Sequence, residues 1–584
     1  MVKEFSISND KVIVNFTAKY CDSPEKLLSS SGFERVLKSY ISRIKNKNSI
    51  IYKGMAEVFP VQDSFSMVSN IRILLKMLVS LELDELSKIN DHYDQLLKNP
   101  IILYDFIEDF YKYWRKLERY TVIQSSHQNE GFQQVTFIEA NSEFSKLILT
   151  TYRQIQKHII GVMPSVYRQI PAGGNAGIIV SGMDWDIPDS YSNLSNIPFI
   201  ETILLDTPFI TYPKRNTRDG FFEETMANPL EYCDINPDHW MCYPAKIGTL
   251  LAYIYFHRDF MAHGIALSNL FELAKKSEYM GRRPDIVYVF GAKDNFDKVK
   301  TVFFDDEENS IMMGYVSHSD AIDYFGYMKK MSLTLHNLIM IKRGCLPVHG
   351  AMVNVVLKNG KQANVIIMGD SGAGKSETLE AFRSLNESYI SDMTIVFDDM
   401  GVVKLPPTGK PTASGTEIGA FVRLDDLDPG YAFRELDRCI FMNPDKTNAR
   451  LIIPVASYKD VVKSYPVDMF LYANNYEEGF EQGKELEFFD LIDEAKKVFR
   501  TGARIAKGTT TENGLVTSYF ANPFGPHQKQ AETDKLLDLY FDAFFSTGTK
   551  VGQLRTQLGI PGKEKSGPTN AAIRLLECIE SLNQ

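Results

Sequence analysis

The sequence predicts an α/β protein with a helical N-terminal extension, and three observations lead to that prediction. Short apolar runs typical of buried strands alternate with helix-forming segments over the last two-thirds of the chain. One such run, Val365 to Met368, is followed by a glycine-rich loop and then by helix formers at residues 378–383. Residues 1 to about 165 look mainly helical instead. We therefore expect helices first and α/β domains after them.

The length predicts more than one domain. At 584 residues the chain is too long for one simple core, so two or three domains are expected. The segment 171–177 contains three glycines and a proline, which break helices and mark a boundary. We place a helical extension at 1–165, an α/β substrate-type domain at 166–335, and a P-loop domain at 336–584.

The composition excludes several classes of partner. The chain is 44% hydrophobic and 24% charged, with a net charge of −10, which argues against nucleic acid or an anionic membrane surface. Its start lacks an apolar signal core, and the apolar stretch 71–81 includes Arg72 and Lys76 and is too short to span a bilayer. Six scattered cysteines without a C-x-x-C pair suit reduced thiols in a cytosol. A cytoplasmic protein is expected.

The first domain shows one helical pattern clearly. Phe106, Phe110, Trp114 and Leu117 recur at spacings of four, four and three, which makes one apolar face. Such an aromatic stripe is more typical of a packed core than of a cofactor site. No catalytic pattern stands out here. We interpret residues 1–165 as a helical domain or a partner surface, for example for oligomerisation.

Several short patterns predict the strands and helices of the second domain. Apolar runs at 178–180, 199–205 and 284–293 predict strands, and Thr249 to His263 reads as a helix. The segment Tyr212 to Arg218 is basic and turn-forming. By itself this loop is more typical of a solvated turn than of an anion site.

The glycine-rich loop has the form G-x-x-x-x-G-K-[ST], the pattern of a phosphate-binding P-loop. Its glycines let successive backbone N–H groups surround phosphate oxygens, and the following helix adds the positive end of its dipole. Lys375 would neutralise the β- and γ-phosphates of a nucleotide such as ATP, and the Ser376 hydroxyl would ligate Mg²⁺. The alternative is a chance glycine turn, but the flanking strand and helix favour phosphate binding. The predicted nucleotide-binding residues here are Gly369, Asp370, Ser371, Gly372, Ala373, Gly374, Lys375, Ser376 and Glu377.

Further elements surround this loop. A helix is expected to run to Ile341, and residues 346–356 read as a strand with His349 at its start. The Asn-Gly pair at 359–360 predicts a hairpin into the P-loop strand. Residues 389–392 are predicted to end another strand, where a second carboxylate beside the metal is normally found. Asp398 and Asp399 form a rival acidic pair, which we interpret as the next hairpin turn.

An ordered series of motifs runs through roughly residues 170–584. Its members are PDIVYVFGAK (284–293), YFGYMKK (324–330), His349, the P-loop, Ser391-Asp392, TNARLIIP (447–454) and FRTGARIAKG (499–508). The series resembles the phosphoenolpyruvate carboxykinase family, particularly its ATP-using branch. That family has P-D-F-x-V-x-N-G-A-K, Y-x-G-E-M-K-K, G-x-S-G-T-G-K-T, an Asp-Asp pair, E-N-T-R-x-x-Y-P and a lid, S-G-x-T-A-K-x-A-G-T-E. Tyr327 replaces the glutamate of the second motif.

The resemblance implies a metal site and a set of roles. The family's lysine, histidine and aspartate ligands of Mn²⁺ would be Lys330, His349 and Asp392. A lysine ligates a metal only as the neutral amine, so burial and nearby positive charge, for example from Lys329, must lower its pKa. The other implied roles are phosphate binding by Lys375, Mg²⁺ ligation by Ser376, stabilisation of the transferred phosphoryl group by Arg450, substrate contacts by Tyr324 and Lys329, and a base-side position for Thr569.

The sequence also departs from the family. Ser391 stands where the first aspartate of the pair is expected, and the family's carboxylate-binding arginine motif, T-G-R-S-P-K-D-K, has no clear counterpart. By order along the chain, Arg215 and Arg218 are the nearest candidates. The loop itself is closer to that of HPr kinase, which shares the nucleotide-binding core. That enzyme needs a catalytic aspartate where spacing places Ser391, which weakens the protein-kinase interpretation.

The resemblance therefore implies metal-dependent phosphoryl transfer from a nucleotide. The reaction would be oxaloacetate plus ATP giving phosphoenolpyruvate, CO₂ and ADP, with a small dicarboxylate as the substrate. One alternative is a kinase of the HPr-kinase-like group that acts on another small acid or a protein hydroxyl. The other is a nucleotide-binding regulator without catalysis.

Overall fold

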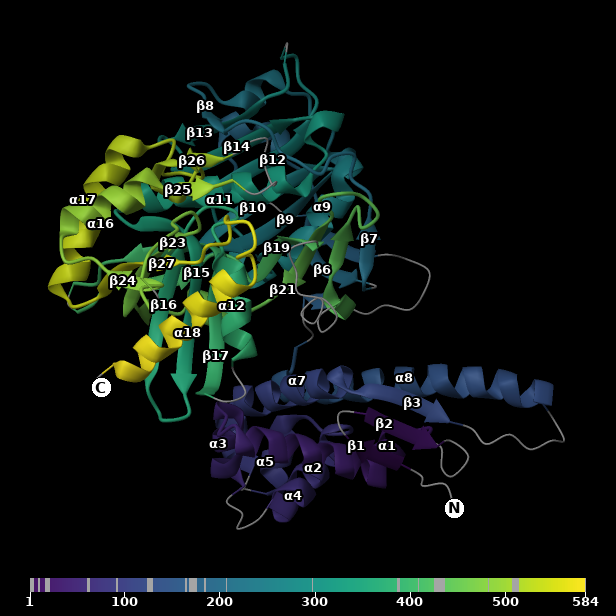
Figure 1. The fold of residues 1–584 in the computed structure, drawn as a ribbon. Helices are drawn as coiled ribbons and strands as arrows, with labels where there is room; N and C mark the ends of the chain where they lie inside the picture. Colours follow the sequence, from purple (N-terminus) through teal and green to yellow (C-terminus); the bar gives the residue numbers. More distant parts are fainter. Residues whose placement is uncertain are drawn as a thin grey trace. The chain divides into compact units, whose positions relative to one another are not determined.

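The computed structural model describes residues 5–8, 11–15, 21–59, 64–90, 93–122, 130–162, 165–167, 176–182, 185–205, 207–296, 298–385, 389–407, 409–424, 436–481, 483–506 and 514–582. The chain divides into two compact units, Met1–Pro164 and Ser165–Gln584, and each is described by itself. The fold is mixed α/β (Figure 1). The predicted boundary segment 171–175 and the end of the predicted lid, 507–508, lie outside the described residues.

The first unit is mainly helical but also contains a small sheet. Its helices are α1 (Pro24–Ser29), α2 (Ser31–Asn46), α3 (Ile50–Val58), α4 (Ser64–Leu78), α5 (Leu83–Ile89), α6 (Asp94–Lys98), α7 (Pro100–Lys116) and α8 (Glu130–Ile160). Strands β1 (Phe5–Ser8) and β2 (Lys11–Asn15) form an antiparallel hairpin, and β3 (Glu118–Val122) pairs with β2 in parallel. The helical character agrees with the sequence prediction, whereas the sheet was not predicted.

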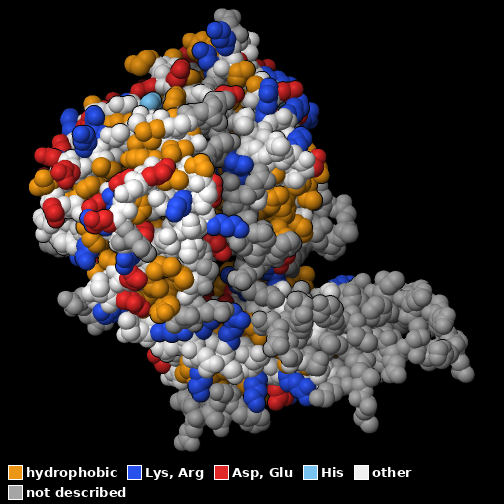
Figure 2. Space-filling model, in the orientation of Figure 1, with side chains coloured by type: hydrophobic (Ala, Val, Ile, Leu, Met, Phe, Trp, Pro, Cys, Tyr) orange, Lys and Arg blue, Asp and Glu red, His pale blue; other side chains and the backbone are white. Residues whose placement is uncertain are grey.

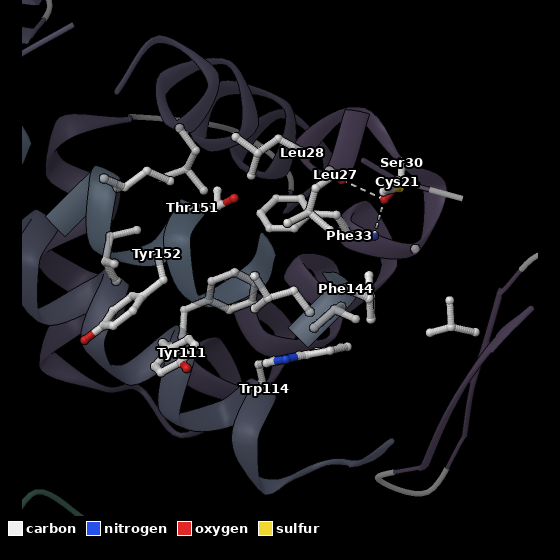
Figure 3. A pocket seen from close by; sticks show the side chains of 18 of the residues that line it. Cys21, Leu27, Leu28, Ser30, Phe33, Tyr111, Trp114, Phe144, Thr151 and Tyr152 are labelled. Carbon is white, nitrogen blue, oxygen red and sulfur yellow. Dashed lines mark hydrogen bonds between the residues drawn. The ribbon is translucent and has the colours of Figure 1, made fainter. Parts of the chain in front are cut away.

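The aromatic stripe of α7 lies in the core of this unit. Phe106 is fully buried and Phe110 nearly so, and the Phe106 ring meets the Tyr40 ring edge-on at 5.4 Å. Beside this core, an apolar cavity of about 120 Å³ is lined by side chains that include Phe33, Trp114 and Phe144 (Figure 3). The cavity contains none of the predicted site residues.

A ten-stranded sheet begins the second unit. Its strands are β4 (Val166–Tyr167), β5 (Ala176–Ser181), β6 (Phe199–Leu205), β8 (Glu223–Glu224), β9 (Trp240–Ile247), β10 (Leu250–His257), β11 (Glu272–Leu273), β12 (Ile286–Ala292), β13 (Thr301–Asp306) and β14 (Ile311–Ser317). The helix predicted over 249–263 is wrong, because β10 pairs with β9 on one side and β12 on the other. Eight consecutive buried residues suit a strand covered on both faces.

An eight-stranded sheet carries the P-loop. Its strands are β15 (Leu346–Leu357), β16 (Gln362–Met368), β17 (Ile390–Lys404), β18 (Thr412–Gly415), β22 (Tyr465–Pro466), β23 (Met469–Asn474), β24 (Leu486–Phe488) and β27 (Lys550–Arg555). β16, β23 and β27 run parallel, and β15 pairs antiparallel with both β16 and β17. Helices α16 (Ile492–Thr501) and α17 (Gln530–Ser546) pack on one face, while α12 (Lys375–Ser384) and α18 (Ser566–Ser581) pack on the other (Figure 1).

Two smaller sheets and several short helices complete the unit. They are the sheet β19 (Gly419–Arg423), β21 (Arg450–Pro454), β20 (Ile440–Met442) and β7 (Phe209–Thr211), the hairpin β25 (Ala503–Ile505) and β26 (Leu515–Thr517), and helices α9 (Met261–Ala266), α10 (Lys276–Tyr279) and α15 (Tyr458–Val462).

Helix α11 (Phe325–Lys342) links the two large sheets. It packs against β12 and β14 of the ten-stranded sheet and against β15 and β17 of the eight-stranded one. Nearly all of its residues are buried, as expected for a helix without a polar face. Its first turns carry Lys329 and Lys330, so two lysines are placed where both sheets meet.

The surface and the cysteines carry little further information on partners. Acidic and basic side chains are interspersed on the face that Figure 2 shows. Among the described residues, no helix combines the length and apolar character that crossing a bilayer requires. The six cysteines, all within the described ranges, form no disulfide with one another.

Candidate active site

The P-loop lies between β16 and α12, so the predicted order of strand, loop and helix is confirmed. Gly372 and Gly374 adopt φ values of 77° and 91°, which disfavour any residue with a Cβ. A Cβ at Gly374 would also lie only 2.5 Å from the Thr556 hydroxyl, which in turn donates to the carbonyl of Ala373. The loop therefore needs its glycines for conformation and for close packing.

Lys375 points into this loop. Its Nζ donates to the carbonyls of Gly369 and Asp370, at 2.7 and 3.0 Å. The side chain is buried, and burial lowers the pKa of Lys375. The ammonium group thus lies over the loop, where it would exchange carbonyl partners for phosphate oxygens.

Three nitrogen groups converge on the carboxylate of Asp399. Lys329 and Lys330 lie 2.6 and 2.7 Å from Oδ2, and Nε2 of His349 lies 2.8 Å from Oδ1. Burial raises the pKa of Asp399, but the charges of Lys329 and Lys330 outweigh it and hold this pKa well below its usual range. Asp399 also has a φ of 145°, a strained value of the kind that concentrates at functional sites.

The hydrogen bonds of His349 leave two acceptors facing each other. Nδ1 donates to the carbonyl of Ala521 at 3.0 Å, so in the neutral ring Nε2 is an acceptor. Yet Nε2 faces a carboxylate oxygen of Asp399, while burial lowers the pKa of His349 and favours the neutral ring. Either a proton on Nε2, which would donate to the carboxylate, or a bound cation resolves the conflict. Metal-binding histidines commonly fix their other nitrogen on a backbone carbonyl in this way.

Lys330 meets a requirement for metal ligation. Burial lowers the pKa of Lys330, and the neighbouring charge of Lys329 lowers it further, while Asp399 opposes the shift. The nearby Lys329 keeps its proton, because its pKa is raised by Asp399 and Glu417 in spite of burial. The pKa values of two adjacent lysines are thus shifted in opposite directions.

The predicted ligand Asp392 does not reach this cluster. It pairs with Val356 across the sheet, whereas His349 pairs with Met400. Seven residues separate His349 from Val356, which is about 23 Å along an extended strand. The strand predicted to end at 392 instead begins at Ile390 and continues to Lys404, so Asp398 and Asp399 lie within a strand and not in a turn.

The acidic pair Asp398-Asp399 contacts both His349 and the serine of the P-loop. Asp399 faces His349, while Oδ1 of Asp398 accepts from the Ser376 hydroxyl at 3.5 Å. The pair therefore occupies the place that the sequence prediction gave to Ser391 and Asp392. A weak sequence signal existed, because strand-like apolar residues at 393–397 and 400–403 flank the two aspartates on both sides.

The predicted substrate residues divide into two groups. Arg218 is partly buried, with its guanidinium 5.5 Å from the centre of the Phe524 ring, and the Nζ of Lys330 lies 4.5 Å from the same centre. Burial raises the pKa of Tyr324, but Arg450, Arg218 and Lys329 oppose the shift through their nearby charges. Arg215, in contrast, is exposed.

Four further residues lie near the P-loop, near Lys329 or in helix α18, and the sequence prediction assigned no role to Arg504 and Glu417. Arg504, in β25 of the predicted lid, lies 3.2 Å from the Asp370 carboxylate of the P-loop. Glu417 is buried 2.9 Å from Lys329 and had no motif to mark it. Thr569 lies in the first turn of α18, where its hydroxyl donates to the carbonyl of Lys565. Glu377 lies in the first turn of α12, beside Ser376.

The comparisons with known proteins gave no assignment. Neither the protein-family models nor the curated proteins include a match to this chain.

The first prediction compares two aspartates of strand β17. Asp399→Asn should lower the free energy of unfolding by about 3–5 kcal/mol, because it leaves the buried Lys329 without its main counter-charge. Asp392→Asn, at an exposed position of the same strand, should change it by less than about 0.5 kcal/mol. Urea unfolding followed by circular dichroism measures both. Equal losses would contradict the central place of Asp399.

The second prediction concerns pH. Burial raises the pKa of Glu417 to about 7, and Lys329 opposes this only in part because it also serves Asp399. The folded state thus holds this proton to a higher pH than the unfolded state does. The contribution of Glu417 to the free energy of unfolding is complete below about pH 4.5. This contribution, on the order of 3 kcal/mol, is lost as the pH rises to about 7.

Glu417→Gln should therefore lose less stability than the wild type between pH 4.5 and 7. The exposed Glu532→Gln should follow the wild type. Urea unfolding at a series of pH values measures the free energy of unfolding of the wild type and of both variants. Parallel curves for wild type and Glu417→Gln would show that Glu417 is ionised throughout.

Proposed function

We propose that the protein catalyses metal-dependent phosphoryl transfer between a nucleotide and a small dicarboxylic acid, in the manner of a phosphoenolpyruvate carboxykinase. One observation carries this proposal: Lys330 and His349 meet at Asp399, directly beside the P-loop. The backbone N–H of Gly369 donates to the carbonyl of His349 at 3.0 Å, so the loop and the metal-type cluster are joined by adjacent strands. The γ-phosphate of a nucleotide and a phosphoryl acceptor bound to the metal would thus lie in one site.

The residues suit the metals that the resemblance implies. The neutral imidazole of His349, the carboxylate of Asp399 and a deprotonated Lys330 would hold Mn²⁺, and Ser376 with Asp398 would hold the Mg²⁺ of the nucleotide. Bound there, the Mn²⁺ ion would supply Lewis acidity toward the substrate's oxygen atoms. Asp392 takes no part in this proposal.

Lysine and arginine side chains of the protein would bind the nucleotide phosphates and the substrate. Lys375 would bind the phosphates, and Arg450, near Tyr324, would stabilise charge on the phosphoryl group as it moves. Arg218 would bind a carboxylate of the substrate, for which a planar guanidinium is well suited. With oxaloacetate, loss of CO₂ leaves an enolate oxygen that accepts the γ-phosphoryl group of ATP and gives phosphoenolpyruvate.

A second candidate is a kinase of the same core with another acceptor. It is favoured by the position of Asp398, because a carboxylate 3.5 Å from the Ser376 hydroxyl removes the objection that Ser391 raised. Such a carboxylate could orient an acceptor hydroxyl as well as a metal.

The deciding experiment assays the purified protein with ATP, GTP or pyrophosphate against a panel of acids, with Mg²⁺ and Mn²⁺ present. Nucleotide-dependent turnover of oxaloacetate supports the carboxykinase proposal, provided that Lys375→Ala abolishes it. Turnover of another acid or a hydroxyl acceptor supports the kinase instead. Nucleotide binding without turnover of any acceptor would indicate a regulator.

The third prediction uses two arginines of one loop. If Arg218 binds the substrate carboxylate, Arg218→Ala should lose about 2–4 kcal/mol in kcat/KM for oxaloacetate. Arg215→Ala removes the same charge from an exposed position three residues away and should stay within a few-fold of the wild type. Steady-state kinetics at fixed ionic strength measure both. A similar loss in the two variants would point to general electrostatic attraction and not to a carboxylate contact.

A further inference from the structure

Three side chains that commonly bind metals meet at one edge of the ten-stranded sheet. His257 is the last residue of β10, Asp259 belongs to the short 3-10 helix Arg258–Phe260, and His318 directly follows β14. Strands β10, β12 and β14 run parallel, so their carboxyl ends lie at the same edge. Open α/β sheets commonly bind ligands at that edge. The cluster shares no residue with the candidate active site.

The donor atoms of this cluster are close enough to share one ion. One ligand atom from each of the three side chains lies within 4.8 Å of the others. Nδ1 of His257 is 3.3 Å from Oδ2 of Asp259, and Nε2 of His318 is 2.9 Å from the same oxygen. A tetrahedral ion with ligands at ~2.1 Å separates its ligand atoms by about 3.4 Å, so only small side-chain rotations are needed.

The hydrogen bond of His257 directs the lone pair of Nδ1 toward Asp259. Its Nδ1 accepts the backbone N–H of Asp259, at 3.3 Å, so this nitrogen presents a lone pair to the turn. The Asp259 carboxylate oxygen lies at the same distance from that nitrogen, and it is an acceptor too. A cation bound here would replace the Asp259 N–H on Nδ1 and would lie within reach of the Asp259 carboxylate and of His318.

Aromatic packing holds the imidazole rings in place. The rings of His257 and His318 lie edge to face with centroids 5.2 Å apart, and the Phe260 ring lies 5.2 Å from His318. The backbone N–H of His318 donates to the carbonyl of Ala292 at 2.7 Å, which ties this ligand to the end of β12. His257 is buried, whereas the side chain of Asp259 is 52% exposed, so an ion can enter from solvent.

We propose that His257, Asp259 and His318 form a binding site for a divalent transition-metal ion such as Zn²⁺. Two imidazoles and one carboxylate are the ligands that zinc and its neighbours prefer, whereas Mg²⁺ and Ca²⁺ favour sites made of oxygen. Three protein ligands leave a coordination position for water or a small anion. The site does not depend on the proposed phosphoryl transfer.

Equilibrium dialysis with metal analysis tests the site. The EDTA-treated full-length protein is dialysed against Zn²⁺ with excess Mg²⁺ present, which occupies oxygen-rich sites. We expect the wild type to bind one equivalent more than His318→Ala and than Asp259→Asn. Circular dichroism checks that each variant folds. If His318→Ala does not fold, the Zn²⁺ content of Asp259→Asn, which keeps the side-chain shape, tests the site.

The control is His527→Ala, which removes a partly buried histidine that stacks on Phe221 outside the cluster. It should bind Zn²⁺ as the wild type does, and so should His349→Ala at this site if the two clusters are independent. Wild-type zinc content and affinity in both His318→Ala and Asp259→Asn would overturn the proposal. So would a wild-type protein that takes up no Zn²⁺, because the cluster would then be a hydrogen-bonded network only.

Discussion

The carboxylate of Asp399 is the group on which the candidate active site depends. Lys329 and Lys330 from α11 and His349 from β15 all converge on it, at 2.6 to 2.8 Å. Without this charge, two adjacent lysines in a largely buried setting would repel each other and lose most of their solvation. The same carboxylate therefore stabilises the junction between helix and sheet, raises the pKa of Lys329 and opposes the lowering of the pKa of Lys330 and His349 by burial.

This arrangement depends on an irregular backbone at Asp399. Asp399 pairs with Gly350, one position from His349, so in a regular strand the side chains of Asp399 and His349 would point to opposite faces of the sheet. The φ of 145° at Asp399 departs from regular strand geometry and allows the two side chains to meet. Gly350 contributes to the close approach, since a Cβ there would lie 2.6 Å from the carbonyl of Ile367 on the P-loop strand. Backbone packing thus fixes the distance between the metal-type cluster and the phosphate loop.

The sequence predicts local features of this site better than long-range ones. The P-loop and the strand of His349 follow from patterns within a dozen residues, and both are found as expected. The role of Asp399 could not be derived that way, because two adjacent aspartates are typical of turns and only the pairing of β15 with β17 places them in a strand. Likewise, Arg215 and Arg218 have the same chemistry in the sequence. Only the fold places Arg218 against the Phe524 ring, which Lys330 also contacts, and leaves Arg215 exposed.

The two histidine-containing clusters have different surroundings. His349 lies within a paired strand, where lysines and carboxylates from neighbouring elements surround it. His257 and His318 lie where parallel strands end, with aromatic rings packed against them and the charge of Lys293 near His257. Two imidazoles and one carboxylate are a ligand set that softer ions prefer over Mg²⁺. The two clusters therefore place similar side chains in different surroundings, one among lysines beside the P-loop and one at the ends of parallel strands.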